Sequence, residues 1–84
     1  MATPVLIYSL STCGVCKSVK RLLAERGVLF DAIDVDLLEE KEKAAAAEEV
    51  RRLNPRFSFP TTVIGTQVVV GFQKDQILKA LELM

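Results

Sequence analysis

Residues 5–16 read VLIYSLSTCGVC and join a short apolar run to the first turn of a helix. The run Val5–Tyr8, with Pro4 just before it, is rich in β-branched and aromatic residues, which is typical of a buried strand. After it, apolar residues recur at steps of three and four over Cys16–Leu23, and the pattern stops at Gly27. This spacing predicts an amphipathic helix that ends at the glycine.

The only two cysteines of the chain, Cys13 and Cys16, lie at this junction. Cys13 stands at the start of the expected helix, where unpaired backbone N–H groups and the helix dipole favour a negative charge. The neighbouring thiol and Lys17 add to this effect, and the thiolate is the nucleophile in disulfide exchange. Cys16 falls inside the helix and should be more buried. We therefore expect Cys13 to be the nucleophile and Cys16 the resolving thiol.

Two other uses of the cysteine pair fit the sequence less well. A structural disulfide between them closes so small a ring that the loop-closure model gives it only about 2 kcal/mol. A zinc ion usually takes four Cys or His ligands, whereas the chain has two cysteines and no histidine. The sequence therefore favours a catalytic dithiol with no bound metal.

The length and charge of the chain limit the classes of function. Its 84 residues, half of them apolar, predict a single domain over residues 1–84. Eleven basic and eleven acidic side chains cancel, which does not favour nucleic acid or a membrane surface as a partner. No apolar stretch is long enough to span a membrane, and residues 1–4 do not look like a secretory signal. We expect a cytoplasmic monomer, in a compartment that keeps thiols reduced.

The middle of the chain predicts a second strand and a second helix. Residues 29–35 alternate imperfectly and predict a strand parallel to the first, with its acidic side chains near a sheet edge. Residues 37–53 are rich in good helix formers and predict a helix that ends before Asn54-Pro55.

The second helix is expected to be amphipathic. Acids stand four residues before bases in the pairs Glu39–Lys43 and Glu48–Arg52, which indicates a solvated face. The buried stripe should consist of Leu38, Ala45, Ala46, Val50 and Leu53.

The last third of the chain predicts a hairpin and a third helix. Residues 60–64 and 67–70 are strands, and a type II′ turn at Gly65-Thr66 joins them. A helix then opens near Asp75, with Ile77, Leu78, Leu81 and Leu83 on its buried side. The order β-α-β-α-β-β-α implies a three-layer α/β domain with a mixed sheet.

Three motifs in this order resemble the glutaredoxin family of the thioredoxin superfamily. They are residues 8–16, YSLSTCGVC; residues 58–61, SFPT; and residues 70–75, VGFQKD. The resemblance covers nearly the whole chain and implies a thioredoxin-like fold, with a four-stranded mixed sheet in the order 2-1-3-4 flanked by helices. It also implies a cis peptide bond between Phe59 and Pro60, facing the cysteines. The substrate-binding residues that it implies are Thr12, Gly14, Val15, Lys17, Phe59, Pro60, Thr61, Gly71 and Phe72.

Departures from the usual family pattern bear on the electron donor. Gly14-Val15 stands where Pro-Tyr is typical, and Leu10 stands where a lysine often contacts a glutathione carboxylate. Gly71-Phe72, followed by Asp75, resembles the glutaredoxin-like redoxins that a flavoenzyme of the thioredoxin-reductase type reduces. The donor is therefore either such a flavoenzyme or glutathione, for which Lys17, Arg51 or Arg56 would supply a carboxylate contact.

The leading hypothesis is a thiol–disulfide oxidoreductase, without a tightly bound cofactor, that reduces a protein disulfide or a glutathione mixed disulfide. The alternative is an iron–sulfur carrier, because cluster-binding glutaredoxins often have glycine directly after the first cysteine, as Gly14 is here. A [2Fe–2S] cluster would then need Cys13 from two subunits and two glutathiones. A third possibility is an interaction module without turnover. Phe57, Phe59 and Phe72 are candidates for an apolar rim around the cysteines, and at least one of them is expected to belong to the core.

Overall fold

The elements of the structure, a computed structural model that describes residues 5–83, follow the order expected from the sequence. Pro4, expected at the start of the first strand, lies outside the described residues. The strands are β1 (Val5–Ser9), β2 (Asp31–Asp34), β3 (Thr61–Ile64) and β4 (Gln67–Val70). The helices are α1 (Gly14–Glu25), α2 (Glu40–Leu53) and α3 (Lys74–Glu82), and a short 3-10 turn, η1 (Val35–Leu37), precedes α2.

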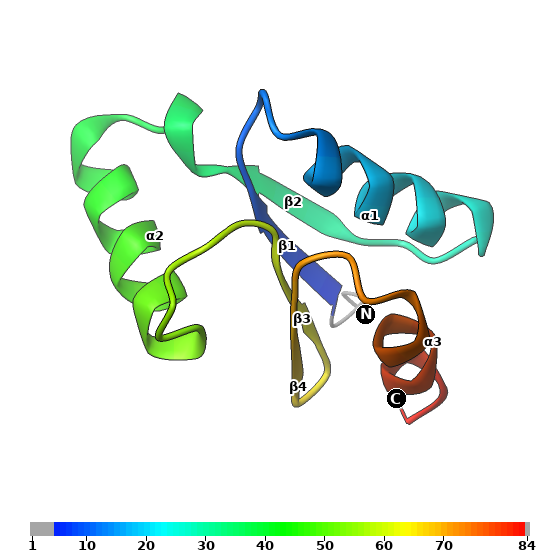
Figure 1. Cartoon of the computed structure of the whole chain (residues 1–84). Helices are drawn as coiled ribbons and strands as arrows, with labels where there is room; N and C mark the ends of the chain where they lie inside the picture. The colour runs from blue at the N-terminus through cyan, green and yellow to red at the C-terminus, as the bar shows by residue number, and fades with distance from the viewer. Residues whose placement is uncertain (1–4, 84) are drawn as a thin grey trace.

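The four strands form a mixed sheet in the order β2-β1-β3-β4 (Figure 1). β1 pairs in parallel with β2, whereas β3 is antiparallel to both β1 and β4. This confirms the expected strand order. β2 is an edge strand, so Asp31 and Asp34 lie at the sheet edge as predicted.

The strand register places the three family motifs at one end of the sheet. Tyr8, near the end of β1, pairs with Thr61 at the start of β3, and Thr61 pairs with Val70 at the end of β4. The segments that follow β1, precede β3 and follow β4 therefore leave the sheet at the same end. At the opposite end, Gly65 opens the β3–β4 turn with a φ of 61°, which fits the predicted type II′ turn.

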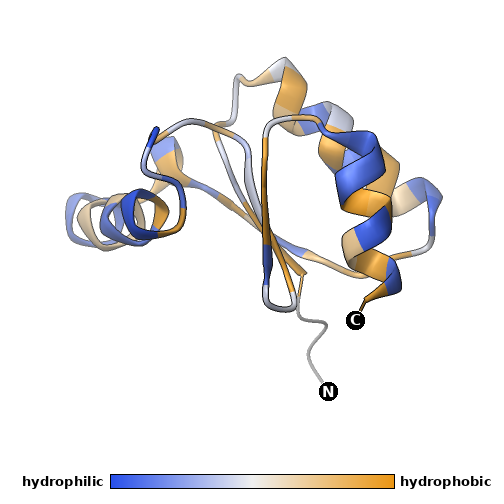
Figure 2. Ribbon diagram, turned by 60° about the horizontal axis from the view of Figure 1, so that its bottom comes forward, coloured by the Kyte–Doolittle hydropathy of each residue, from blue (hydrophilic) through white to orange (hydrophobic). Residues whose placement is uncertain are grey.

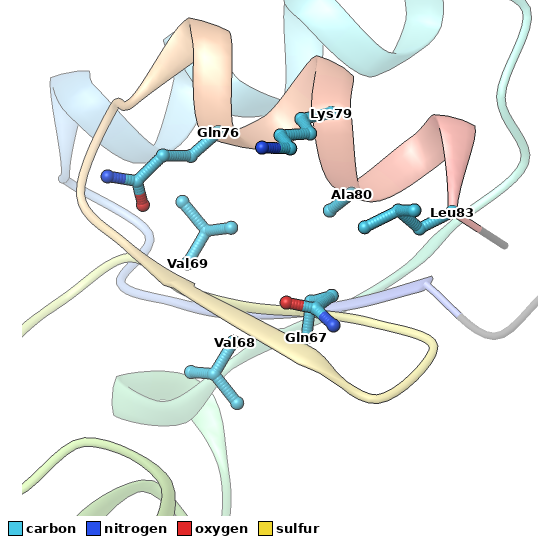
Figure 3. A pocket seen from close by; sticks show the side chains of 7 residues that line it. All are labelled: Gln67, Val68, Val69, Gln76, Lys79, Ala80 and Leu83. Atoms are coloured by element: carbon cyan, nitrogen blue, oxygen red, sulfur yellow. The ribbon is translucent and has the colours of Figure 1, made fainter.

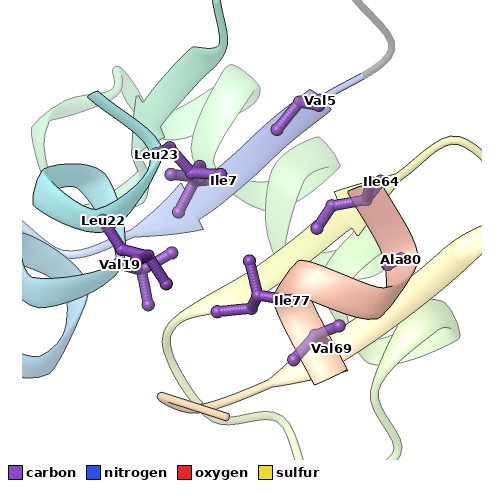
Figure 4. Close-up of a cluster of buried hydrophobic side chains, with 9 residues drawn as sticks. All are labelled: Val5, Ile7, Val19, Leu22, Leu23, Ile64, Val69, Ile77 and Ala80. Atoms are coloured by element: carbon purple, nitrogen blue, oxygen red, sulfur yellow. The ribbon is translucent and has the colours of Figure 1, made fainter. Parts of the chain in front are cut away.

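Buried side chains form two clusters on opposite faces of the sheet, because neighbouring residues of β1 point to alternate sides. The larger cluster joins the sheet to α1 and α3 (Figure 4); it consists of Val5, Ile7, Val19, Leu22, Leu23, Ile64, Val69, Ile77 and Ala80. The smaller cluster joins the other face to α2 and contains Tyr8, Val35 and Val50. Apolar residues accordingly run along the strands and the inner sides of α1 and α3, whereas α2 is mostly hydrophilic (Figure 2). The three expected layers are present.

The second strand and the second helix are both shorter than predicted. β2 covers Asp31–Asp34 rather than residues 29–35, since Leu29 is 76% exposed and Val35 already belongs to η1. η1 also includes Leu37, which is 69% exposed, and α2 begins only at Glu40. The predicted bounds were too wide because apolar residues occur in the sequence on both sides of the four residues that form β2.

The buried stripe of α2 is narrower than predicted. Val50 is fully buried, and Ala46 and Leu53 pack against the smaller cluster. Ala45 was expected to be buried but is exposed, because with Leu38 it lines an open apolar hollow of about 430 Å³ between α2 and the sheet. The helix touches the sheet mainly through its C-terminal half.

The charged residues at the start of α2 and along it form the solvated face that was predicted, because Glu39, Lys43, Glu48 and Arg52 are all exposed. Arg52 pairs with Glu49, three residues before it. One prediction at the end of α3 was wrong. Leu83 is 65% exposed because α3 ends at Glu82, and Ala80 is buried instead.

Of the helices described, none has the length and apolar character needed to cross a membrane.

Candidate active site

The two cysteines lie at the start of α1, and their surroundings differ. Cys13 is the N-cap residue and keeps an extended backbone, with φ of −85° and ψ of 114°. The backbone N–H of Cys16 donates a hydrogen bond to Cys13 Sγ over 3.1 Å. Cys13 is partly exposed, whereas Cys16 is completely buried, and neither forms a disulfide in this structure. The N-cap position therefore holds an accessible sulfur against the free N–H groups of the helix.

The thiol of Cys16 is held in its protonated form. Burial raises the pKa of Cys16 to about 11, and its hydrogen bond with the Cys13 side chain acts in the same direction. The charge of Lys20 lowers the pKa of Cys16, but its influence is smaller.

Two serine–aspartate contacts fix the segment between β1 and α1. Ser9 Oγ donates to Asp34 Oδ1 over 2.5 Å, and these residues also pair in the β1–β2 register. Two residues further along both segments, Ser11 donates to Asp36 through its backbone N–H (2.9 Å) and its hydroxyl (2.5 Å). The parallel pairing of β1 and β2 is thus continued by side chains up to the residues that precede Cys13.

These contacts lower the pKa of both aspartates. The hydrogen bond from Ser9, and then the interaction with Lys20, hold the pKa of Asp34 below its ordinary value. The two hydrogen bonds from Ser11 lower the pKa of Asp36. Sequence reasoning missed these contacts. The available signal was the matched spacing of Ser9-Leu10-Ser11 and Asp34-Val35-Asp36 at the ends of two strands predicted to be parallel.

A second segment reaches the same end of the sheet at the predicted cis peptide bond between Phe59 and Pro60, which the structure confirms. Pro60 is buried, and its carbonyl oxygen accepts a hydrogen bond from Gly71 N–H over 3.0 Å. This bond joins the second family motif to the third. Thr61, the next residue, is completely buried at the start of β3.

Asn54, at the end of α2, organises the segment that leads to Pro60. The side chain is 2% exposed, and its Nδ2 donates to Ser58 O, Ser58 Oγ and Thr61 Oγ1 over 3.0–3.3 Å. Its Oδ1 accepts from the backbone N–H of Arg56 over 3.1 Å. The sequence indicated only a helix end at Asn54-Pro55. A tertiary role of this kind leaves no signal in local sequence spacing.

Of the three candidate rim phenylalanines, Phe59 is partly buried and packs against the smaller core cluster, as expected for at least one of them. Phe57 and Phe72 are 37% and 43% exposed. The Phe57 ring meets that of Phe59 edge-on at 5.7 Å, and the Arg51 guanidinium lies 4.7 Å from the Phe57 ring centre. Phe57 also has a φ of 49°, which is rare for a bulky residue.

The remaining predicted site residues lie within four positions of Cys13 in the sequence, and all of them are exposed. Thr12, Gly14 and Lys17 are exposed, and Val15 is 48% exposed. A separate hollow of about 270 Å³ lies between β4 and α3 (Figure 3). None of the residues that line it belongs to the predicted site; they are Gln67, Val68, Val69, Gln76, Lys79, Ala80 and Leu83.

The described residues contain no group of three or more His, Cys, Asp or Glu side chains that could hold a metal ion. A [2Fe–2S] cluster needs four ligands, usually thiolates. Because Cys16 is buried, this chain offers the accessible sulfur of Cys13 alone. A cluster would therefore have to draw its other ligands from outside the chain.

A partly exposed cysteine at a helix N-cap, followed by a buried cysteine one turn later, defines a CxxC thiol–disulfide redoxin on a thioredoxin-like fold. The chain belongs to the glutaredoxin family, whose sequence model matches residues 5–69. This is a family of redox proteins that act as oxidoreductases and electron carriers.

Individual relatives agree with this assignment. The crystal structure of Methanosarcina acetivorans methanoredoxin is 48% identical, with a TM-score of 0.89, and the match covers 94% of this chain and 84% of that one. A glutaredoxin-like 8.6 kDa protein of the Clostridium pasteurianum rubredoxin operon is 32% identical over 78 residues, which is 93% of this chain and 97% of that protein. Glutaredoxin-like protein NrdH of Escherichia coli K12 is 32% identical over 73 residues, or 87% of this chain and 83% of that protein.

More distant structures share the fold alone. One of them is a buckwheat glutaredoxin–glutathione complex, which is 23% identical with a TM-score of 0.76 and is matched over 95% of this chain and 74% of its own. Glutathione is thus bound by a structural relative.

Proposed function

We propose that this protein reduces disulfides, with Cys13 as the nucleophile and Cys16 as the resolving thiol. The observation that carries the proposal is the hydrogen bond of 3.1 Å from Cys16 N–H to Cys13 Sγ at the start of α1. It stabilises a thiolate on the sulfur that a substrate can reach. The buried, protonated Cys16 is then available for the second step.

The reaction has two exchange steps. The Cys13 thiolate attacks one sulfur of the substrate disulfide, a mixed disulfide forms, and the other substrate sulfur leaves as a thiolate. Cys16 then loses its proton and attacks the Cys13 sulfur, so that the Cys13–Cys16 disulfide forms and the second substrate thiolate leaves. The two thiolates take up protons from solvent. The substrate has gained two electrons, which the protein has lost.

The same end of the sheet supplies a docking surface for the substrate. Val15 and Phe72 present exposed apolar side chains for a protein substrate. The backbone of Phe59, next to Pro60, pairs with an extended segment of the substrate, in the manner of strand addition. Thr12, Gly14, Lys17 and Gly71 complete this surface, whereas Thr61, also predicted to bind substrate, is completely buried. The common exit of the three motifs from the sheet supports this assignment.

The electron donor is a dithiol flavoenzyme of the thioredoxin-reductase type. Leu10 is uncharged and packs against the smaller core cluster, so no cation stands where a lysine often contacts a glutathione carboxylate. Arg51, which the sequence offered as a contact for a glutathione carboxylate, has its guanidinium over the Phe57 ring. Gly71-Phe72 with Asp75 resembles the redoxins that use such a flavoenzyme. Reduction of the oxidised protein by glutathione with glutathione reductase, compared with reduction by thioredoxin reductase, tests this choice.

Trapping the mixed disulfide tests the assignment of the cysteines. Cys16→Ser should accumulate a covalent adduct with a disulfide substrate on Cys13, seen by mass spectrometry and released by dithiothreitol. Cys13→Ser should form no adduct and show no reductase activity. Full activity of Cys13→Ser, or an adduct on Cys16 in the wild-type protein, would contradict the proposed order of attack.

An iron–sulfur carrier is the second candidate function, because Gly14 directly follows Cys13 and a Cβ at Gly14 would meet nothing within 4 Å. Anaerobic reconstitution with iron, sulfide and glutathione separates the two candidates. A stable brown dimer that needs Cys13 favours the carrier. A colourless monomer that reduces disulfides favours the oxidoreductase.

A further inference from the structure

On the inner side of α1, three polar side chains from three elements meet. Lys20 of α1 forms an ion pair with Asp34 of β2, with 3.2 Å between Nζ and Oδ1. Ser9, which is completely buried at the end of β1, donates to the same Asp34 oxygen over 2.5 Å. The side chains of Lys20 and Asp34 are 27% and 30% exposed. We call these three residues the Lys20 group.

The Lys20 group fixes a positive charge close to Cys16. Lys20 stands four residues after Cys16, so the two side chains are neighbours on one face of α1, with about 5–6 Å between their Cβ atoms. A free lysine side chain would move through many conformations in solvent. The contact with Asp34 keeps the ammonium turned toward the sheet, on the side where Cys16 is buried.

We infer that Lys20, held by Asp34 and Ser9, is a positioning residue that favours the thiolate form of Cys16 in the resolving step. The inference rests on the proposed function. In the mixed disulfide, Cys16 gives its proton to solvent and attacks the Cys13 sulfur. The Cys13–Cys16 bond forms while the bond to the substrate sulfur breaks, and the electron pair leaves with the substrate thiolate.

The charges around Cys16 change between the two steps. Cys13 and Lys20 act on the Cys16 thiol from its own helix, Asp34 of β2 acts through its contact with Lys20, and β1 contributes the uncharged Ser9. Once Cys13 is part of the mixed disulfide, it carries no charge. Lys20 then remains as the charged side chain on the inner face of α1, because Lys17 is exposed. Its influence is therefore greatest in the resolving step.

A chromogenic disulfide separates the two steps. One equivalent of dithiobis(nitrobenzoate) releases a first coloured thiolate when Cys13 attacks and a second one when Cys16 resolves the mixed disulfide. Stopped-flow absorbance gives both rates as a function of pH. The variants are Lys20→Met, Lys20→Gln and Lys20→Arg. Lys41→Met is the matched control, because it removes the same charge from an exposed position in α2.

We expect Lys20→Met and Lys20→Gln to slow the second release about threefold near neutral pH. A rise of one unit in the pKa of Cys16 would lower its thiolate fraction about tenfold. The more basic thiolate is about threefold more nucleophilic, so the net loss of rate is about threefold. The pH profile of the second release should shift upward, and the first release should keep its rate. Lys20→Arg should restore the second rate, and Lys41→Met should leave both rates unchanged.

The inference is wrong if both charge-removing variants release the second thiolate at the wild-type rate with an unshifted pH profile. Lys20→Gln keeps a hydrogen-bonding group for Asp34, so it provides this measurement even where Lys20→Met folds poorly. If Lys20 had only a structural role, its substitution would slow both releases. Lys20→Arg would then not restore the pH profile of the second release. Failure of the wild-type protein to give any second release would contradict the proposed function itself.

Discussion

Cys16 donates its backbone N–H to the Sγ of Cys13 over 3.1 Å, so the two cysteines are joined before any disulfide forms between them. The relationship is asymmetric. Cys13 precedes the first helical residue and is partly exposed, whereas Cys16 is completely buried in the first turn. The position at which α1 begins therefore decides which sulfur receives stabilisation and which one is shielded from solvent.

This burial predicts that the reduced protein loses stability at alkaline pH. The pKa of Cys16 is raised by burial from 9.0 to about 11, so the folded state holds this proton more tightly than the unfolded state. The stabilisation is complete below about pH 9 and is lost as the pH rises toward 11. Its slope is at most about 1.4 kcal/mol per pH unit.

Urea unfolding of the reduced wild-type protein and of Cys16→Ser, over the same pH range, measures this contribution. The difference between the two free energies of unfolding should shrink as the pH rises. Other alkaline transitions affect both proteins and cancel in the difference. Parallel curves would mean that Cys16 does not retain its proton in the folded state.

The sequence was sufficient for the elements that depend on local pattern. The strand β1, the start of α1 at the cysteines and the β3–β4 hairpin all agree with the expectation. Each rests on a short apolar run or on a glycine or proline at a boundary. The strand order and the cis peptide bond before Pro60 came from the family resemblance alone.

What the sequence did not predict depends on contacts between distant segments. Asn54 was seen only as a helix end, and Ser9 only as part of the first family motif, yet both are buried and hydrogen-bonded across elements. Ala45 follows the helical period of a buried face, but the sheet does not reach it.

The attachment of α2 to the sheet should depend strongly on Val50. This side chain is fully buried in the smaller core cluster, so Val50→Ala loses contacts worth about 2 kcal/mol, of which the better helix propensity of alanine returns about 0.5 kcal/mol. Leu37→Ala is the control, because Leu37 is 69% exposed, and it should change stability by less than about 0.5 kcal/mol. Thermal unfolding followed by circular dichroism gives both values. Equal effects would show that α2 is held by other contacts.

Phe72 should contribute to binding of protein substrates and little to stability. It is 43% exposed and follows Gly71, whose N–H is bonded to the Pro60 carbonyl oxygen. Phe72→Ala is expected to raise KM for a protein disulfide about fivefold, which corresponds to about 1 kcal/mol of apolar contact. The rate with a small aromatic disulfide should stay unchanged. Leu83→Ala, at another exposed apolar residue after α3, should affect neither; an identical effect of both variants would contradict a specific role for Phe72.

Gly14→Pro should stabilise the protein and leave the attack by Cys13 intact. Gly14 is the first residue of α1, where proline is favoured because the N–H has no partner within the helix. The preceding residue, Cys13, already has the extended backbone that a following proline requires, with ψ of 114°. A Cβ at position 14 meets nothing within 4 Å.

The expected gain is about 0.5–1 kcal/mol, since proline reduces the conformational freedom of the unfolded chain. Urea unfolding measures it, and the first thiolate release from dithiobis(nitrobenzoate) reports on Cys13. Gly14→Ala is the control that separates removal of glycine from the effect of the proline ring. A loss of stability in Gly14→Pro, with Gly14→Ala unaffected, would show that the backbone N–H of Gly14 makes a contact that the folded protein requires.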